Sequence, residues 1–152
     1  MDSAPELLVA QLAHHARALN FLAQGLTTEQ AAVRLHADGP SAAWILDHLS
    51  EMTHSTLEAL GGTAPAPLAG GAWPKPLAAF QRLHGELHRQ ASALPETDWN
   101  GPPAVPVLPA FREALRTRQA FLAGHVYHLA YHAGQLGSLR ATLGATPSGG
   151  KR

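Results

Sequence analysis

The sequence predicts an all-α protein: a four-helix bundle with a short extra helix after the first long one. Leucine and alanine dominate the chain, valine and isoleucine are scarce, and few segments alternate with a period of two residues. Apolar residues instead recur at helical spacing in four long stretches, which is typical of amphipathic helices that face a common core. A chain of 152 residues is expected to fold as one domain over 1–152.

The first two helices are indicated by their capping residues. Ser3 is a candidate N-cap for the first long helix, because Glu6 follows three residues later, and Gly25 should end that helix. Thr27 or Thr28 then caps a short helix in the segment TTEQAAVRL.

The second long helix should begin after Ser41 and end at Gly61. Its apolar positions are Trp44, Ile45, Leu49, Met52 and Leu60. Residues 61–76 are rich in glycine, proline and alanine, without helical periodicity. This length suits a crossover linker between two parallel helices better than a tight antiparallel turn.

The third long helix is predicted at about 76–94, and the proline-rich segment 95–109 should be irregular. The fourth helix is predicted from about Ala110 to Leu143, with Gly144 ending it. The tail at 145–152 is expected to be flexible.

Three histidines at helical spacing mark the fourth helix as the candidate functional segment. At 100° per residue, His125, His128 and His132 fall within about 60° of one another on the helix surface. The same face carries a stripe of leucines, so the imidazoles should point toward the other helices. Ionisable rings on a buried face need a partner or must stay neutral.

A metal ion is one such partner. His128 and His132 are four residues apart, a spacing that can chelate one divalent ion, although histidine-rich helices also produce such pairs by chance. A third ligand from a facing helix would leave coordination positions open for water. His48 is the natural donor, because it is the histidine on the inner face of the second long helix.

The sequence segments around these histidines indicate a protein family more specifically than the histidine spacing does. The segments YHAGQLGSLRATLG and SAAWILDHL, together with the lead-in LTTEQAAVRLHADGPSAAW, resemble motifs of the DinB-like (DinB/YfiT) superfamily. The resemblance covers roughly residues 26–144. It implies a bundle with up-down-down-up connectivity and a divalent metal held by His48, His128 and His132. The chain departs from the pattern at Ala133, where many relatives carry an arginine.

Alternatives stay open for the neighbouring polar residues. His125 either supports the ligands or faces a substrate, or it is simply packed in the core. Gln135 could orient a ligand or fill a polar gap, and Glu51 could support His48 or be a surface charge. The pair His84 and His88 is expected on a solvated helix face. Core or dimer contact is the role expected for Tyr127 and Tyr131.

Composition narrows the chemistry. The chain has no cysteine, so any metal site must use histidine, carboxylate or water, and any thiol must come from outside. Its zero formal net charge argues against nucleic-acid or membrane binding. No long apolar run or signal peptide is apparent, and a cytoplasmic location is expected.

Function divides into three hypotheses. The first is a metal-dependent enzyme that activates a low-molecular-weight thiol or water, of the S-transferase or hydrolase type; DinB-like relatives include thiol-dependent S-transferases and isomerases. The second is a non-catalytic metal-binding or stress-response bundle, and the third is a plain bundle with packed histidines. Zinc or nickel is the metal expected first, with iron, manganese or copper as alternatives. A small-molecule substrate or thiol and a homodimeric assembly are the partners expected.

Overall fold

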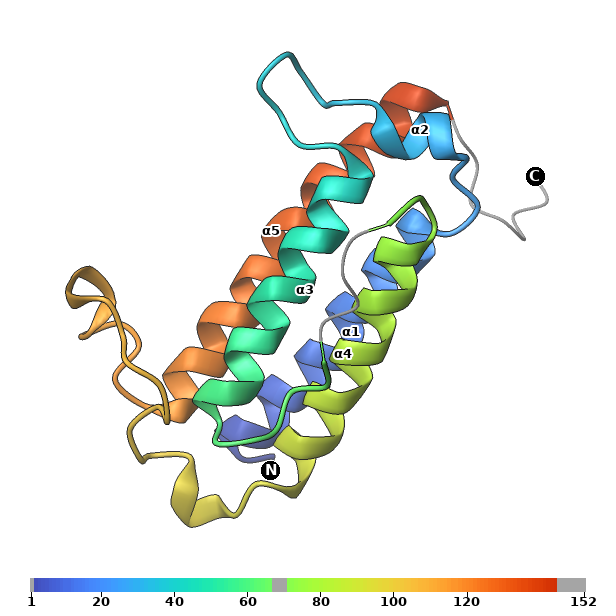
Figure 1. Ribbon diagram of the computed structural model, residues 1–152. Helices are drawn as coiled ribbons and strands as arrows, with labels where there is room; N and C mark the ends of the chain where they lie inside the picture. The colour runs from blue at the N-terminus through green and yellow to red at the C-terminus, as the bar shows by residue number, and fades with distance from the viewer. Residues whose placement is uncertain (1, 67–70, 145–152) are drawn as a thin grey trace.

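Four long helices lie side by side in the computed structural model, which describes residues 2–66 and 71–144 (Figure 1). They are α1 (Ala4–Ala23), α3 (Ala42–Ala59), α4 (Lys75–Ala93) and α5 (Arg118–Leu143). The short helix α2 (Thr28–Ala32) follows α1, and two 3-10 turns, Glu96–Asp98 and Pro109–Phe111, precede α5. No strand occurs in the described ranges, so the predicted all-α bundle is confirmed.

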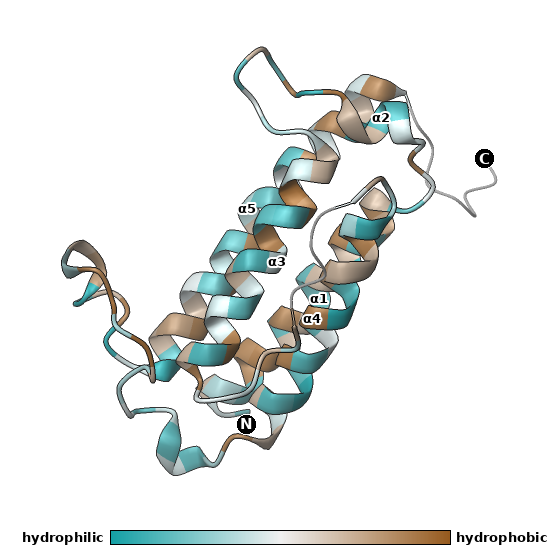
Figure 2. Ribbon diagram, in the orientation of Figure 1, coloured by the Kyte–Doolittle hydropathy of each residue, from teal (hydrophilic) through white to brown (hydrophobic). Residues whose placement is uncertain are grey.

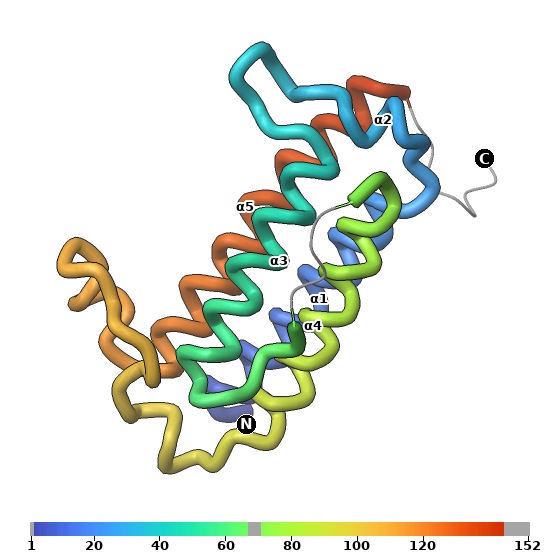
Figure 3. Tube along the Cα trace, in the orientation of Figure 1, coloured from blue at the N-terminus to red at the C-terminus, as the bar shows by residue number. Residues whose placement is uncertain are grey.

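The connectivity is up-down-down-up. The chain trace shows that α3 ends and α4 begins at opposite ends of the bundle, so these two helices run in the same direction (Figure 3). Helices α1 and α5 run the other way. Each long helix contacts two neighbours: α1 packs on α4 and α5, and α3 packs on the same two helices. The predicted crossover at 61–76 therefore joins the two parallel helices.

The helix ends follow the capping pattern of the sequence. Ser3 and Glu6 form a reciprocal capping box at the start of α1, and Thr27 forms one with Gln30 at α2. The hydroxyl of Ser41 accepts a hydrogen bond from the backbone of Trp44 at 3.2 Å and so caps α3. Helix α2 is shorter than predicted, because its backbone turns to extended geometry at Val33.

The start of α5 is eight residues later than predicted, at Arg118 rather than Ala110. The hydroxyl of Thr117 caps the helix by accepting from the backbone of Ala120 at 3.1 Å. The backbone N–H groups of Arg118 and Gln119 donate to the carbonyls of Gly101 and Trp99, both at 3.0 Å. The preceding loop therefore satisfies donors that would otherwise be bonded within a longer helix.

Leucines from all four long helices fill the core, and the helices carry both hydrophilic and hydrophobic residues (Figure 2). The fully buried large side chains are Phe80, Ile45 and the leucines 12, 19, 46, 49, 57, 87, 122, 129, 136 and 139. Among the described residues, one arginine is buried beside this core. Arg140 donates from Nη1 to the carbonyls of Leu22 and Gln24 and so ties α5 to the C-terminal end of α1.

The long linker is anchored to α4 in its described part. The backbone N–H of Thr63 donates to Oε1 of Gln90 at 3.2 Å, and Nε2 of Gln90 donates back to the Thr63 carbonyl at 2.9 Å. The predicted tail at 145–152 lies outside the described residues. Within the described ranges, no helix combines the length and apolar character needed to cross a bilayer.

Candidate metal centre

Three imidazoles converge between α3 and α5. His48 comes from α3, and His128 and His132 come from successive turns of α5. Nε2 of His128 lies 3.1 Å from Nε2 of His48 and 2.9 Å from Nε2 of His132. One ring nitrogen from each residue lies within 4.8 Å of the other two. The structure therefore brings together the three residues that the sequence indicates as ligands.

This donor set fits a divalent cation. A neutral imidazole has one N–H, and the single Nε2 of His128 would have to serve both neighbouring rings at once. A cation shared by three lone pairs removes that conflict. Two ligand nitrogens that each lie about 2.0–2.1 Å from one ion are themselves about 2.9–3.4 Å apart at angles between octahedral and tetrahedral, which is close to the 2.9 and 3.1 Å found here. In the described part of the chain, no fourth histidine, aspartate or glutamate joins the group.

Two neighbours orient the ligand rings. Nδ1 of His132 lies 2.7 Å from Oε1 of Gln135, whose Nε2 donates to the hydroxyl of Tyr131 at 3.4 Å. Because the amide oxygen can only accept, His132 carries its proton on Nδ1 and presents a lone pair at Nε2. The indole of Trp44 stacks on His48 with centroids 4.7 Å apart and an angle of 12°.

Burial favours the neutral form of His128 and His132. Desolvation, followed by the nearby His132 and His48, lowers the pKa of His128 to about 4. Desolvation also lowers the pKa of His132, and the hydrogen bond to Gln135 opposes this shift. Neutral imidazole is the form that binds a metal ion.

The cluster opens into a pocket of about 670 Å³. His128 and His132 line this pocket, together with residues of the loop that precedes α3. The complete lining is Arg34, Asp38, Gly39, Pro40, Ser41, Trp44, His128, Tyr131, His132 and Gln135.

Sequence patterns alone miss several of these pocket residues. Trp44 is expected among inward apolar positions, but half of its surface is exposed, and it lines the pocket. Tyr131 is expected to make core or dimer contacts; it lies beside His132, with ring centroids 5.2 Å apart, and lines the same pocket. The sequence signal that could have placed Tyr131 in the pocket is its position, directly before a ligand histidine and four residues before Gln135. The sequence offers no comparable signal for Arg34 or Asp38.

His125 lies away from the pocket and is packed in the core. It is 5% exposed, and its Nε2 lies 3.3 Å from the hydroxyl of Thr53. That hydroxyl donates to the Leu49 carbonyl at 2.7 Å, so it accepts from His125. Burial, followed by His84 and His128, lowers the pKa of His125 to about 3. Of the roles left open for His125, the structure favours the packed one.

His84 corrects an expectation. The sequence predicts a solvated face, but His84 is 6% exposed, and its Nε2 has no hydrogen-bond partner among the described residues. Burial, followed by the neighbouring His88, lowers its pKa to about 4. The expectation fails because α4 turns this ring toward Phe80 and the core, with centroids 5.6 Å apart. His88 is half-buried.

Glu51 is exposed, one turn after His48 on α3. Its charge acts on Asp47, whose pKa is raised by desolvation first and by Glu51 second. Within the described ranges, no hydrogen bond joins Glu51 to the histidines. The geometry thus supports the surface-charge interpretation of Glu51.

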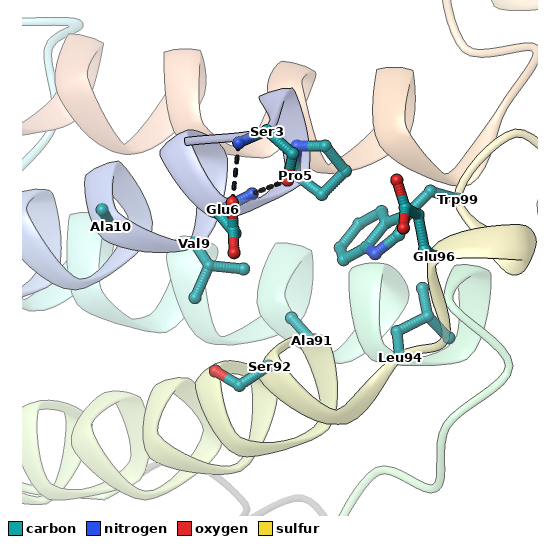
Figure 4. A pocket seen from close by; sticks show the side chains of 10 residues that line it. All are labelled: Ser3, Pro5, Glu6, Val9, Ala10, Ala91, Ser92, Leu94, Glu96 and Trp99. Atoms are coloured by element: carbon teal, nitrogen blue, oxygen red, sulfur yellow. Dashed lines mark hydrogen bonds between the residues drawn. The ribbon is translucent and has the colours of Figure 1, made fainter. Parts of the chain in front are cut away.

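A second pocket, of about 530 Å³, lies at the start of α1 and the end of α4 (Figure 4). Its polar groups include Ser3 and Glu6, whose reciprocal hydrogen bonds already cap α1. Trp99 closes one side of this pocket, and none of the clustered histidines lines it.

Comparison with known proteins agrees with the geometry. The sequence profile of the DinB superfamily matches residues 11–136, a range that contains all three clustered histidines. The chain belongs to the DinB superfamily. No curated protein matches the sequence.

Proposed function

We propose that this protein is a metal-dependent enzyme that activates a low-molecular-weight thiol, or water, at His48, His128 and His132. The observation that carries the proposal is a group of three histidine nitrogens with no fourth protein ligand in the described ranges, of which His128 and His132 line an open pocket. Structural metal sites in proteins are usually closed by four protein ligands, whereas catalytic sites keep a position open.

A divalent ion in such a site lowers the pKa of a water or thiol that reaches its open position. The protein's own residues prepare the site for it. Gln135 holds His132 in the tautomer with a free Nε2, and Trp44 fixes the plane of His48 by stacking. The volume of the pocket, about 670 Å³, leaves room for a small molecule beside His128 and His132. Because the chain has no cysteine, a thiol must enter as a cosubstrate.

The two reactions differ in their need for a base. Hydrolysis requires a group that accepts a proton from water, and the acidic residue lining the pocket is Asp38. Transfer of a thiol to an electrophile requires release of the thiol proton to solvent. A thiol starts from a pKa of about 8.5, far below that of water, so the ion can favour this release without a protein base. Thiol transfer needs no protein base in addition to the metal centre, so it is the reaction to test first.

The test loads the purified protein with zinc or nickel and measures conjugation of glutathione or cysteine to monochlorobimane. Hydrolysis of 4-nitrophenyl acetate is measured in parallel. We expect metal-dependent thiol conjugation that is lost on chelation and in His128→Ala, and retained in the matched variant His14→Ala, which changes an exposed histidine on α1. A metal-loaded protein that catalyses neither reaction would contradict the enzyme proposal and favour a non-catalytic metal-binding bundle.

A further inference from the structure

Arg34 lines the pocket that is also lined by His128 and His132. Apart from the histidines, Arg34 is the only basic residue among the described residues that line this pocket. It is exposed, and it lies in the loop between α2 and α3. A guanidinium presents five N–H donors in a planar fork that matches a carboxylate.

The loop that carries Arg34 is held to the metal-centre helix. Arg34 forms an antiparallel bridge with Ser41, the N-cap residue of the helix that carries His48. The backbone N–H of Leu35 donates to the Pro40 carbonyl at 3.0 Å, and that of Gly39 donates to the His36 carbonyl at 2.9 Å. The position of Arg34 relative to the histidines is therefore set by the backbone.

The guanidinium of Arg34 has further N–H groups that can donate to a ligand. Its Nη1 donates to the carbonyl of Ala37 at 3.1 Å, which directs the guanidinium along the loop. Among the ion pairs of the described residues, none involves Arg34, although Asp38 lines the same pocket. A planar anion that enters the pocket can thus form charge-assisted hydrogen bonds with this fork.

Aromatic side chains line the same pocket as Arg34. Trp44 is 50% exposed and stacks on His48, and Tyr131 is 54% exposed and lies beside His132. Exposed indole and phenol rings in a pocket favour contact with a flat or apolar body.

We infer that the pocket binds a small molecule that joins a carboxylate to an apolar body, with Arg34 as the specificity-determining residue for the carboxylate. This inference deepens the proposed function and rests on it for the identity of the pocket as a substrate site. The carboxylate belongs either to the thiol or to the molecule that receives it.

The first experiment needs no turnover. Zinc-loaded protein is titrated with phenylacetate and with its neutral amide, phenylacetamide, while the indole N–H resonance of Trp44 is followed by NMR; the resonance is assigned with Trp44→Phe. We expect phenylacetate to bind about tenfold more tightly than the amide, because an ionised acceptor strengthens the bond to Arg34. Arg34→Gln should abolish this preference, and Arg34→Lys should keep some of it.

The matched control is Arg82→Gln, which removes an exposed arginine that lines a separate pocket on α4. It should leave the preference unchanged. Equal binding of the two probes, or no binding of either, would overturn the inference. A preference that survives Arg34→Gln would also overturn it, because the carboxylate would then bind elsewhere, such as at the metal ion.

A second experiment identifies the source of the carboxylate. In the thiol-conjugation assay, mercaptoacetate and mercaptoethanol are compared by their KM values in wild type and in Arg34→Gln. If wild type has a lower KM for mercaptoacetate than for mercaptoethanol, and Arg34→Gln removes this difference, the carboxylate belongs to the thiol. If the two KM values are equal in wild type, the carboxylate belongs to the acceptor. Because the phenylacetate titration stands without catalysis, failure of the proposed function can be told apart from failure of this inference.

Discussion

Nδ1 of His132 lies 2.7 Å from Oε1 of Gln135, three residues further along α5. The contact selects the tautomer that exposes Nε2 toward His128. Gln135→Ala is expected to weaken zinc binding by about 10–100-fold, the usual effect of removing such a supporting contact. Competition with a chromophoric chelator measures the affinity. Gln11→Ala, at an exposed position on α1, should have no effect, and equal affinities of the two variants would remove the role assigned to Gln135.

Metal retention should depend on pH, because protons compete with the ion for the ring nitrogens. The lowered pKa of His128, about 4, means that this ring is protonated only at more acidic pH than a free histidine, near 6.5. We therefore expect the ion to be retained at pH 6.5 and to be lost at about pH 4–6. Metal content after dialysis, with circular dichroism to follow folding, measures this. Full metal content in folded protein at pH 3 would argue against histidine ligands.

His84 should make the fold sensitive to acid. Its folded pKa, about 4, lies below the unfolded value near 6.5, so the unfolded chain takes up a proton first as the pH falls. The associated stability is fully present above pH 6.5 and is lost as pH falls toward 4, by up to about 3 kcal/mol.

In the variant His84→Leu, the free energy of unfolding should decrease less between pH 6.5 and pH 4 than it does in wild type. Urea unfolding at several pH values measures it, with His14→Leu as the control at an exposed site. If both variants follow the same pH profile as wild type, His84 is not the group responsible.

Arg140 is expected to be the most sensitive polar position of the bundle core. Arg140→Met removes the donor to the carbonyls of Leu22 and Gln24 and leaves both without that partner. We expect a loss of about 2–4 kcal/mol in the free energy of unfolding. Arg116→Met, at an exposed site, should change it by less than about 0.5 kcal/mol. A loss for Arg140→Met as small as that of the control would show that the buried bonds contribute little.

The features that could be predicted from sequence are those governed by short-range patterns. Ser3 and Ser41 indicate helix starts because capping depends on residues only three apart. His128 and His132 could be paired because one helical turn places them together. Joining His48 to them rests on its inward-facing position and on the resemblance to DinB-like proteins.

The remaining features depend on tertiary contacts that no local pattern encodes. The start of α5 depends on the carbonyls of Trp99 and Gly101, which lie 17 to 20 residues before the N–H groups that donate to them. The burial of His84 depends on how α4 is rotated in the bundle. Arg34 joins the pocket because a folded loop brings it over a helix that begins later in the chain.

The most direct test of the metal centre is metal analysis of protein purified without a chelator or an affinity tag. Wild type is compared with His48→Ala, His128→Ala and His132→Ala, and with the exposed-site control His14→Ala. The three-histidine site predicts about one divalent ion per chain in wild type and control, and its loss in the three cluster variants. Wild type that holds no metal even after reconstitution, or cluster variants that keep it, would contradict the metal centre.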